Sequence, residues 1–439
     1  MFRKWFLRTA LLWAAALAFT ACGDSAGGSS GGTPVYLTLE VTDYAEFTTA
    51  LETIKNDNAP YGGEYTVKIS ADITVPYGKL ISGSKYTGKN IILKGVGGEQ
   101  TIQYNKLNAL YTLFEISDGT LTLDENITLK GVADNTKALL IARDDGAIVI
   151  NSGAKITGNI NLTTGDPDGA GYTGAGGIQV DGGTLVMLGG EISGNSAARG
   201  GGVGIWHGGT FTMSGGVIKE NGVHHFDNYL AAAIGGGVHL NNVGDVFNMT
   251  GGSIINNKAF KNGGGVSVCC GTFTMSGTAL VSENTAGGTG GGVALCCCTF
   301  NMQGGTISKN IAGADDSQVS GQDRTPFRFG GGVGRWGSPG NQNSFNSAQL
   351  IRWDGPVIFH KTGGMIYGSN DAANGNKVLH LAPRDPLYPT VAGNAGNIKG
   401  DAVYMFRATA GYATFVIDGP DVPNTFDHVD NEKTDVTMP

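Results

Sequence analysis

The sequence predicts an all-β protein: a single-stranded right-handed parallel β-helix with three short strands per rung and a short N-terminal capping helix. Three observations lead to this prediction: a repeated cassette, three β-forming segments in each repeat, and one amphipathic helix ahead of them. The cassette opens on a glycine run, usually GGGV, and closes on an asparagine. A period this short is typical of stacked units that contact only their neighbours. Complete copies occupy residues 200–221, 235–257, 263–284 and 290–310, and an earlier variant occupies residues 176–195.

Residues 43–55 form the one segment with a helical pattern. Asp43 is followed by Glu46 three residues later, which is the spacing of a capping box. A short helix ahead of a solenoid is expected to cover its first open rung. Apolar residues recur at helical spacing and form one stripe: Phe47, Ala50, Leu51 and Ile54.

Alignment of the repeats gives three columns of apolar residues. In the first two columns the members of a pair are two residues apart, so we expect both to face the core and the residue between them to face water. Stacked rungs then place equivalent side chains about 4.8 Å apart. The first column runs from Phe114/Ile116 through Ile178/Val180, Val203/Ile205, Val238/Leu240 and Val266/Val268 to Val293/Leu295. The second includes Leu185/Met187, Phe211/Met213, Phe247/Met249, Phe273/Met275 and Phe300/Met302, and the third is anchored by Ile127, Ile156, Ile192, Ile218, Ile254, Val281 and Ile307.

A leucine-rich repeat is the main structural alternative, because its period overlaps and it also carries an asparagine. It would need a helical or 3₁₀ segment in each unit, whereas these repeats show three β-forming segments and no helical period. Calcium-binding nonapeptide repeats are excluded, because the glycine runs lack the aspartate of that motif.

Composition limits the class of protein and its partners. Glycine accounts for 74 of 439 residues and proline for 13, which argues against collagen and against a proline-rich disordered chain. The formal charge is −8 and no basic stripe is present, so nucleic acid is not an expected partner. No cofactor is expected either.

The N-terminus has the order of a secretory signal: Arg3, Lys4 and Arg8, then an apolar stretch, then small residues ending at Ala21-Cys22. This end resembles the lipobox of bacterial lipoproteins, although Phe19 stands where leucine is usual. The resemblance implies cleavage before Cys22, a lipid on its thiol, a membrane as partner through that lipid, and a location in the cell envelope at the outer membrane or cell surface. The alternative is a plain secreted protein with a free Cys22. The expected division is therefore signal peptide (1–21), lipidated cysteine and linker (22–34), N-terminal cap (35–64), β-helix (65–405) and C-terminal cap or tail (406–439).

The repeat itself resembles known surface proteins. GGGV together with I-x-x-N, as in residues 192–195 and 218–221, is similar to the repeats of chlamydial polymorphic outer-membrane proteins. The longer unit G-T-F-x-M-x-G-G-x-I-x-x-N resembles the pectate-lyase-like β-helix repeats of spirochaetal and gut-bacterial surface lipoproteins. This resemblance covers roughly residues 110–405 and implies a β-helix exposed on the cell surface.

Most conspicuous residues of the cassette have a structural interpretation. The closing asparagines tolerate the left-handed conformation of a sharp turn and can form a hydrogen-bonded ladder along the axis, with a ligand-binding row as the alternative. The glycine runs supply positive φ, and no helix start follows them as a phosphate loop would require. The asparagines are Asn159, Asn195, Asn221, Asn257, Asn284 and Asn310.

Four of five neighbouring cysteines occupy equal offsets in two adjacent repeats, and Cys298 is the fifth. The register predicts Cys269 over Cys296 and Cys270 over Cys297, at a Cα separation compatible with a disulfide. A disulfide, reduced thiols and a thiolate metal site all remain open, and Cys298 would stay outside either bridge.

Four histidines lie close in sequence and could converge on a metal, with exposed loop histidines as the alternative. They are His207, His224, His225 and His239, of which His239 is expected at an outward strand position.

Long insertions fall at one corner of the rung, at residues 160–175, 222–234 and 311–329. Insertions on one edge of a solenoid commonly build its binding face, although ordinary variable loops would look the same. The candidate binding residues are Asp166, Asp168, Tyr172, His224, His225, Tyr229, Arg324, Phe327 and Arg328.

These patterns favour a non-catalytic scaffold for adhesion or binding of a host or cell-surface protein or glycan. The alternative is a carbohydrate-active enzyme, a polysaccharide lyase or glycoside hydrolase on the same fold; a structural envelope component is a third reading. Hydrolysis needs two carboxylates at a defined separation, but the acidic pairs Asp144/Asp145 and Asp315/Asp316 are not expected to recur on neighbouring rungs in a way that builds a cluster. No catalytic residue is therefore predicted.

Overall fold

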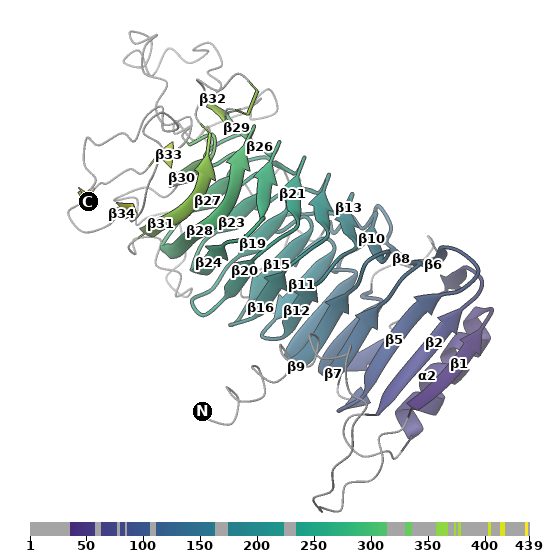
Figure 1. Ribbon diagram of the computed structural model, residues 1–439. Coiled ribbons are helices and arrows are strands. Elements are labelled where there is room, and N and C mark those ends of the chain that lie inside the picture. The colour runs from purple at the N-terminus through teal and green to yellow at the C-terminus, as the bar shows by residue number, and fades with distance from the viewer. Residues whose placement is uncertain are drawn as a thin grey trace, which may run out of the picture. The chain divides into compact units, whose positions relative to one another are not determined.

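The computed structural model describes residues 36–57, 63–76, 80–83, 86–105, 111–162, 174–223, 234–313, 330–335, 357–367, 373–374, 376–378, 403–404, 413–417 and 435–437. The chain divides into two units, Met1–Pro34 and Val35–Pro439, and every described residue belongs to the second. This second unit is a right-handed parallel β-helix of about nine turns, which confirms the predicted fold class. Figure 1 shows the strands of successive rungs side by side.

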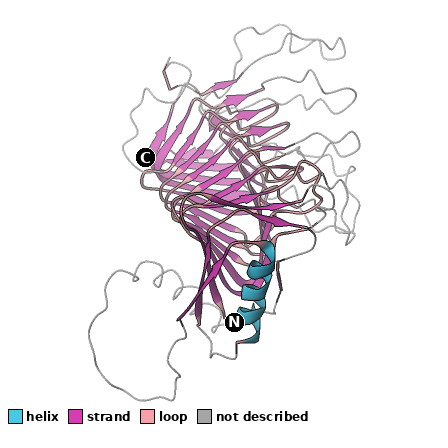
Figure 2. Ribbon diagram, turned by 90° about the vertical axis from the view of Figure 1, so that its right-hand side faces the viewer, coloured by secondary structure: helices cyan, strands magenta, loops and turns pink. Residues whose placement is uncertain are grey.

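The single helix of the described part, α2 (Tyr44–Asn56), covers the first rungs, as predicted. The Glu46 backbone N–H donates to Asp43 Oδ1 at 2.8 Å, and Glu46 Oε2 accepts from the Thr42 backbone N–H at 2.8 Å. Its apolar stripe is buried. Strand β1 (Tyr36–Val41) pairs in parallel with β2 (Glu64–Ile69), so the sheet already begins ahead of the helix. Figure 2 shows α2 alongside these strands.

Three main strand columns build each rung, and we name them columns A, B and C in chain order. Each strand pairs in parallel with its equivalents on the neighbouring rungs. Column A contains β4 (Ile81–Gly83), the first parts of β7 (Phe114–Leu123) and β9 (Leu140–Ile150), β11 (Ile178–Asp181), β15 (Val203–Trp206), β19 (Val238–Leu240), β23 (Val266–Val268), β27 (Val293–Leu295), β30 (Val333–Arg335) and β33 (Val403–Tyr404).

Column B contains β1, β2, β5 (Asn90–Gly95), the second parts of β7 and β9, β12 (Thr184–Met187), β16 (Thr210–Met213), β20 (Val246–Met249), β24 (Gly271–Met275), β28 (Cys298–Ser308), β31 (Val357–Ile366), β34 (Ala413–Ile417) and β35 (Asp435–Thr437). Column C contains β3 (Ile73–Val75), β6 (Gln100–Tyr104), β8 (Ile127–Lys130), β10 (Lys155–Thr157), β13 (Glu191–Ser193), β17 (Val217–Lys219), β21 (Ser253–Ile255), β25 (Leu280–Ser282) and the ends of β28 and β31.

The structure adds a fourth column of two-residue strands, column D, which the sequence pattern did not reveal. It follows the closing asparagine of each repeat, and two residues are too few to show an alternating pattern. Its strands are β14 (Ser196–Ala197), β18 (Gly222–Val223), β22 (Lys258–Ala259), β26 (Thr285–Ala286), β29 (Ile311–Ala312) and β32 (Lys377–Val378).

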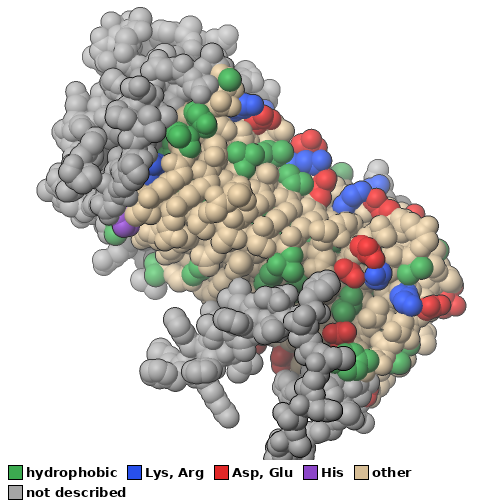
Figure 3. Space-filling view, in the orientation of Figure 1, with side chains coloured by type: hydrophobic (Ala, Val, Ile, Leu, Met, Phe, Trp, Pro, Cys, Tyr) green, Lys and Arg blue, Asp and Glu red, His purple; other side chains and the backbone are tan. Residues whose placement is uncertain are grey.

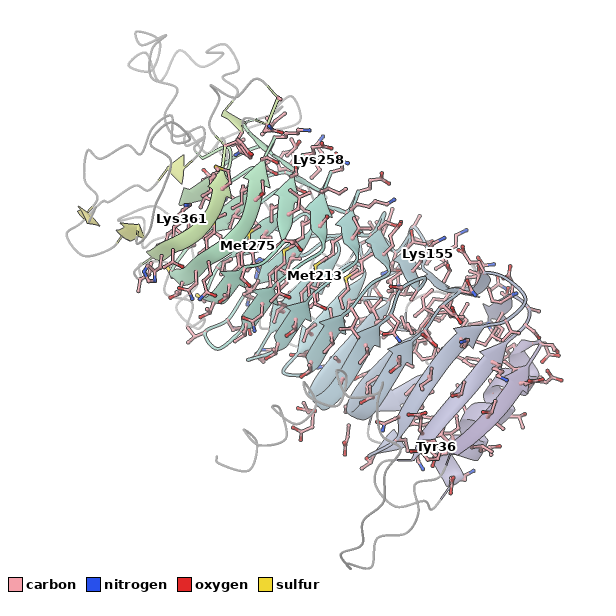
Figure 4. All side chains as sticks on the ribbon, viewed as in Figure 1. Tyr36, Lys155, Met213, Lys258, Met275 and Lys361 are labelled. Carbon is pink, nitrogen blue, oxygen red and sulfur yellow. The ribbon has the colours of Figure 1, made fainter. Side chains whose placement is uncertain are left out.

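Identical side chains stack through the core of column B. Five phenylalanine rings lie parallel, with centroids 4.7–4.9 Å apart. Met213 and Met275 belong to a parallel methionine row beside them (Figure 4), which ends where Lys361 pairs with Met302. The stacked phenylalanines are Phe211, Phe247, Phe273, Phe300 and Phe359.

The predicted register is wrong at one point of column C. Ile156 pairs with Leu129, whereas Ile127 pairs with Gln100 on the preceding rung. Ile127 and Leu129 are both buried, because they lie two residues apart on the same face of β8. Either could serve as the anchor, so apolar pattern alone did not decide between them.

The closing asparagines form the predicted buried ladder. Asn221 Nδ2 donates to Asn257 Oδ1 at 3.0 Å and to the Ile192 carbonyl at 2.9 Å. This arrangement recurs at Asn195, Asn257, Asn284 and Asn310, whereas Asn159 joins the ladder through its backbone N–H, which donates to Asn195 Oδ1. The left-handed residue is not the asparagine but the one before it, such as Glu220 with φ 55°. The ladder also continues to Asn376, which accepts from Asn310 Nδ2 at 2.9 Å.

Candidate functional site

The outer face of column A differs from the expected solvated surface. The residues between the inward pairs, predicted to face water, are buried on four consecutive rungs: Gly204, His239, Ser267 and Ala294. The residues two positions later are also almost inaccessible: Trp206, Asn241, Cys269 and Cys296. We call these residues together with Arg199 the outer cluster.

Trp206 organises one end of the outer cluster. Its indole lies across Gly204, where an added Cβ would be 2.0 Å from Cη2 of the ring. The same ring packs in a small apolar group with Ala138, Ile141 and Ala175. Glycine is therefore required at position 204 by the close approach of Trp206, and this covering explains why the outward position is dry.

His239 lies at the centre of the outer cluster, fully buried. Its Nε2 is 3.3 Å from Asn241 Oδ1, which also accepts from Arg199 Nη1 at 3.1 Å. Burial, reinforced by the Arg199 charge, lowers the pKa of His239 to about 3, so the imidazole is neutral. Three buried polar atoms here have no hydrogen-bond partner: Trp206 Nε1, His239 Nδ1 and Ser267 Oγ.

A row of ionisable side chains, which we call the turn row, crosses four rungs at the turn between columns A and B. Arg143 Nε contacts Glu115 Oε1 at 2.9 Å, and Arg143 Nη1 bonds to Asp181 Oδ2. The other oxygen of Asp181 lies 2.5 Å from His207 Nδ1. The His207 side chain is 60% exposed. This turn row holds the imidazole in a fixed orientation.

Asp245 lies beside the turn row on the next rung and is buried. Its carboxylate accepts from the backbone N–H groups of Asn241, Asn242 and Gly208 at 3.0, 2.6 and 2.8 Å. Burial raises the pKa of Asp245 to about 7, against the opposing effect of these three donors. The side chain fixes the turn rather than facing a ligand.

The cysteines stack in the predicted register. Ser267 pairs with Ala294 and Gly271 with Cys298, so Cys269 lies opposite Cys296 and Cys270 opposite Cys297. None of the five cysteines at this turn forms a disulfide, and Cys296 Sγ lies 3.5 Å from Cys297 Sγ. Burial raises the pKa of Cys270 to about 12, and the pKa of Cys269 is also well above its usual range.

The outer face of column B is regular and uncharged over five rungs. Its outward side chains are half-buried by their stacked neighbours. Ion pairs lie instead on column C, between Lys219 and Glu191 at 3.2 Å, and at the turn that follows it, between Lys309 and Glu283 at 3.5 Å. Figure 3 shows charged side chains along one edge and at the N-terminal rungs, and a broad area free of them. The uncharged residues are Thr184, Val186, Thr210, Thr212, Val246, Asn248, Thr272, Thr274, Thr299 and Asn301.

The predicted binding residues and Cys22 lie outside the described residues, as do His224 and His225. The remaining two histidines of the proposed metal group have different surroundings: His207 is exposed beside Asp181, and His239 is buried beside Asn241. Within the described ranges no group of three or more His, Cys, Asp or Glu side chains could hold a metal ion. Sequence reasoning missed Asp181, Glu115, Arg143 and Asp245, because they meet only across rungs of unequal length.

Comparison with family models, with curated proteins and with solved structures gave no match. No helix in the described ranges is long and apolar enough to span a membrane. The fold alone therefore defines the class, a parallel β-helix repeat protein.

Proposed function

We propose that the protein is a cell-surface, lipid-anchored scaffold that binds a protein or glycan partner without chemical turnover. The signal sequence and the lipobox-like end at Cys22 support the location. The supporting observation for binding is the outer face of column B, where ten outward residues from β12 to β28 are uncharged and in register.

Threonine hydroxyls and asparagine amides on this face supply donors and acceptors at a regular spacing of about 4.8 Å from rung to rung. Because neighbouring rungs hold the rows in place, little side-chain ordering is needed when a partner binds. Such a face suits an extended neutral partner that offers hydroxyl or amide groups along its length.

A fragment beginning at residue 34 should bind a component of a glycan array or of a surface-protein extract. Thr212→Lys combined with Thr274→Lys should weaken that binding at least about tenfold, since each introduces a charge that the partner must desolvate. Ser253→Lys on column C is the matched control and should bind normally. Equal binding by the column B variant would exclude this face.

A carbohydrate-active enzyme is the second candidate, favoured by the Asp181–His207 pair. Asp181 Oδ1 lies 2.5 Å from His207 Nδ1, the arrangement in which a carboxylate orients an imidazole for general-base catalysis. Arg143 argues against a lyase, because both Glu115 and Asp181 already neutralise it, so it is poorly placed to bind a substrate carboxylate.

Polysaccharide degradation assays separate the two candidates. If the wild-type fragment degrades a polysaccharide and both His207→Gln and Asp181→Asn abolish this activity, the protein is an enzyme and the scaffold proposal is wrong. Binding without turnover in all three proteins is the outcome that the scaffold predicts.

A further inference from the structure

Five thiols gather at one turn of two neighbouring rungs, between β23 and β24 and between β27 and β28. Backbone pairing fixes their register, because Cys296 N donates to the Val268 carbonyl at 2.8 Å and Gly271 pairs with Cys298. The described residues contain no cysteine outside this turn. Two thiol pairs, Cys269/Cys296 and Cys270/Cys297, therefore face each other across the rungs.

Two sulfur atoms of adjacent residues, Cys296 and Cys297, lie 3.5 Å apart. A disulfide between adjacent residues is disfavoured, because their Cα atoms are about 3.8 Å apart, below the usual lower limit of about 4.4 Å. Closing that small ring would also distort a planar trans peptide bond. The short contact therefore marks thiol packing rather than a bond about to form.

The pair Cys269 and Cys296 is also poorly arranged. Both continue the outward alternation of column A, so their Cα–Cβ bonds are nearly parallel and their Cβ atoms are about 4.8 Å apart. A disulfide needs about 3.5–4.5 Å between Cβ atoms. Both side chains are 1% exposed, so an oxidant cannot reach either sulfur.

The pair Cys270 and Cys297 is free of both restrictions. Cys297 has φ 52°, in the left-handed region, whereas Cys270 has a negative φ, so their Cα–Cβ bonds are not held parallel. Cys297 is half-buried and is the most accessible thiol of the group. Cys270 is next, at 6% exposure, and the pairing of Gly271 with Cys298 places it opposite Cys297 on the neighbouring rung.

We propose that Cys270 and Cys297 form an inter-rung disulfide by exchange with a small disulfide of the glutathione class. The Cys297 thiolate attacks one sulfur of the oxidant, forms a mixed disulfide and releases one thiolate. The Cys270 thiolate then attacks the Cys297 sulfur, forms the inter-rung S–S bond and releases the second thiolate. Two protein thiols are oxidised, one small disulfide is reduced to two thiols, and the two protons end on those thiols.

This bond would tie the last two complete repeats together at the turn. Cys270 precedes Gly271, whose backbone approaches the Asp245 carbonyl so closely that an added Cβ would lie 2.5 Å from it. The cross-link would therefore join the rung of β27 to a turn that already packs on the rung of β19. It is independent of the proposed binding function, since no residue of the column B face takes part.

The test uses the full-length chain equilibrated with mixtures of reduced and oxidised glutathione, quenched with acid and alkylated. Cleavage after Glu283 places Cys269 and Cys270 in one fragment and Cys296, Cys297 and Cys298 in the other. In the oxidising mixtures the fragments should stay joined, with the loss of two hydrogen masses, and fragment-ion sequencing should locate the bond at Cys270 and Cys297.

Cys270→Ser and Cys297→Ser should each abolish the joined fragments, whereas Cys269→Ser, Cys296→Ser and Cys298→Ser should retain them. A bond located at Cys269 and Cys296 in the wild type would overturn the assignment. So would separate fragments at the most oxidising mixture. The location of the bond in the wild-type protein tests the proposal even if a serine variant fails to fold.

Discussion

At the scale of single residues, burial decides the charge of the outer cluster. His239 occupies the position held by Ser267 and Ala294 on the following rungs, yet it is fully buried with a pKa of about 3. The unfolded chain binds a proton near pH 6.5, whereas the folded chain keeps the imidazole neutral. The resulting stability is present above pH 6.5 and is lost as the pH falls towards about 3.

His239→Ser should remove this acid sensitivity. Between pH 6 and 4, the wild type should lose at most about 1.4 kcal/mol of unfolding free energy per pH unit relative to the variant. Denaturant unfolding of both proteins over a pH series measures the difference. Parallel pH profiles would show that His239 is protonated in the folded protein.

Glu220 illustrates a local strain that the rungs tolerate. It has φ 55°, whereas the equivalent Gly158 and Gly194 of the preceding rungs adopt the same region without a side chain. Glu220→Gly should raise the unfolding free energy by up to about 1 kcal/mol, because the left-handed cost of a Cβ exceeds the entropy that glycine loses. Glu220→Ala keeps the Cβ and should give no gain in the same thermal or denaturant measurement.

At the scale of elements, the asparagine ladder ties each column C strand to the next rung. Asn257 Nδ2 donates to the carbonyls of Ile218 and Ile255 and to Asn284 Oδ1, at 2.9, 3.0 and 3.0 Å. Its own Oδ1 accepts from the backbone and side chain of Asn221 at 3.0 Å each. All these contacts are buried except the one with the Ile255 carbonyl, which is part-buried.

Asn257→Ala should therefore destabilise the protein by about 2–4 kcal/mol, because several buried donors and acceptors lose their partner together. Asn248→Ala, on the half-buried outer face of column B, is the matched control and should change stability by less than about 0.5 kcal/mol. Urea unfolding compares the two. Equal effects would mean that the ladder contributes no more than a surface amide.

The columns could be predicted because their residues repeat in sequence at a nearly constant period. Ile218 and Ile254 fall in one column for that reason, and the pairing confirms it. The ladder position of Asn376 could not be found, since it lies 66 residues after Asn310. The burial of His239 also depends on Trp206 and Arg199, which lie beside it. The alternation of residues along a strand does not specify their positions, so this burial could not be predicted from the sequence.

At the scale of the whole β-helix, the register of the stacked rungs brings the turn row together, and no local sequence motif marks it. The successive contacts of the turn row join residues 28, 38 and 26 positions apart, from Glu115 to Arg143, Asp181 and His207. These unequal separations hide the row in the sequence. The residues of the turn row meet only because the chain returns to the same turn on each rung, although the intervening segments differ in length.

Stacking also predicts how far the effect of a destabilising substitution extends along the β-helix. Each rung pairs only with its two neighbours, so stability is approximately a sum of rung and interface contributions. Phe247 lies in parallel stacks with Phe211 and Phe273, at 4.7 and 4.9 Å. Phe247→Ala should cost about 3–5 kcal/mol at those two interfaces.

Hydrogen exchange followed by mass spectrometry should then show faster exchange in β16, β20 and β24, with β5 and the second part of β7 unchanged. Rungs near residue 247 can open locally without unfolding of distant rungs, so the increase in exchange should be confined to the strands next to the substitution. Thr212→Ala, on the outer face of the same column, provides the comparison and should leave exchange in the core strands close to wild type. Uniform acceleration from β2 to β28 would instead mean that the β-helix opens as one cooperative unit, and the nearest-neighbour description would fail.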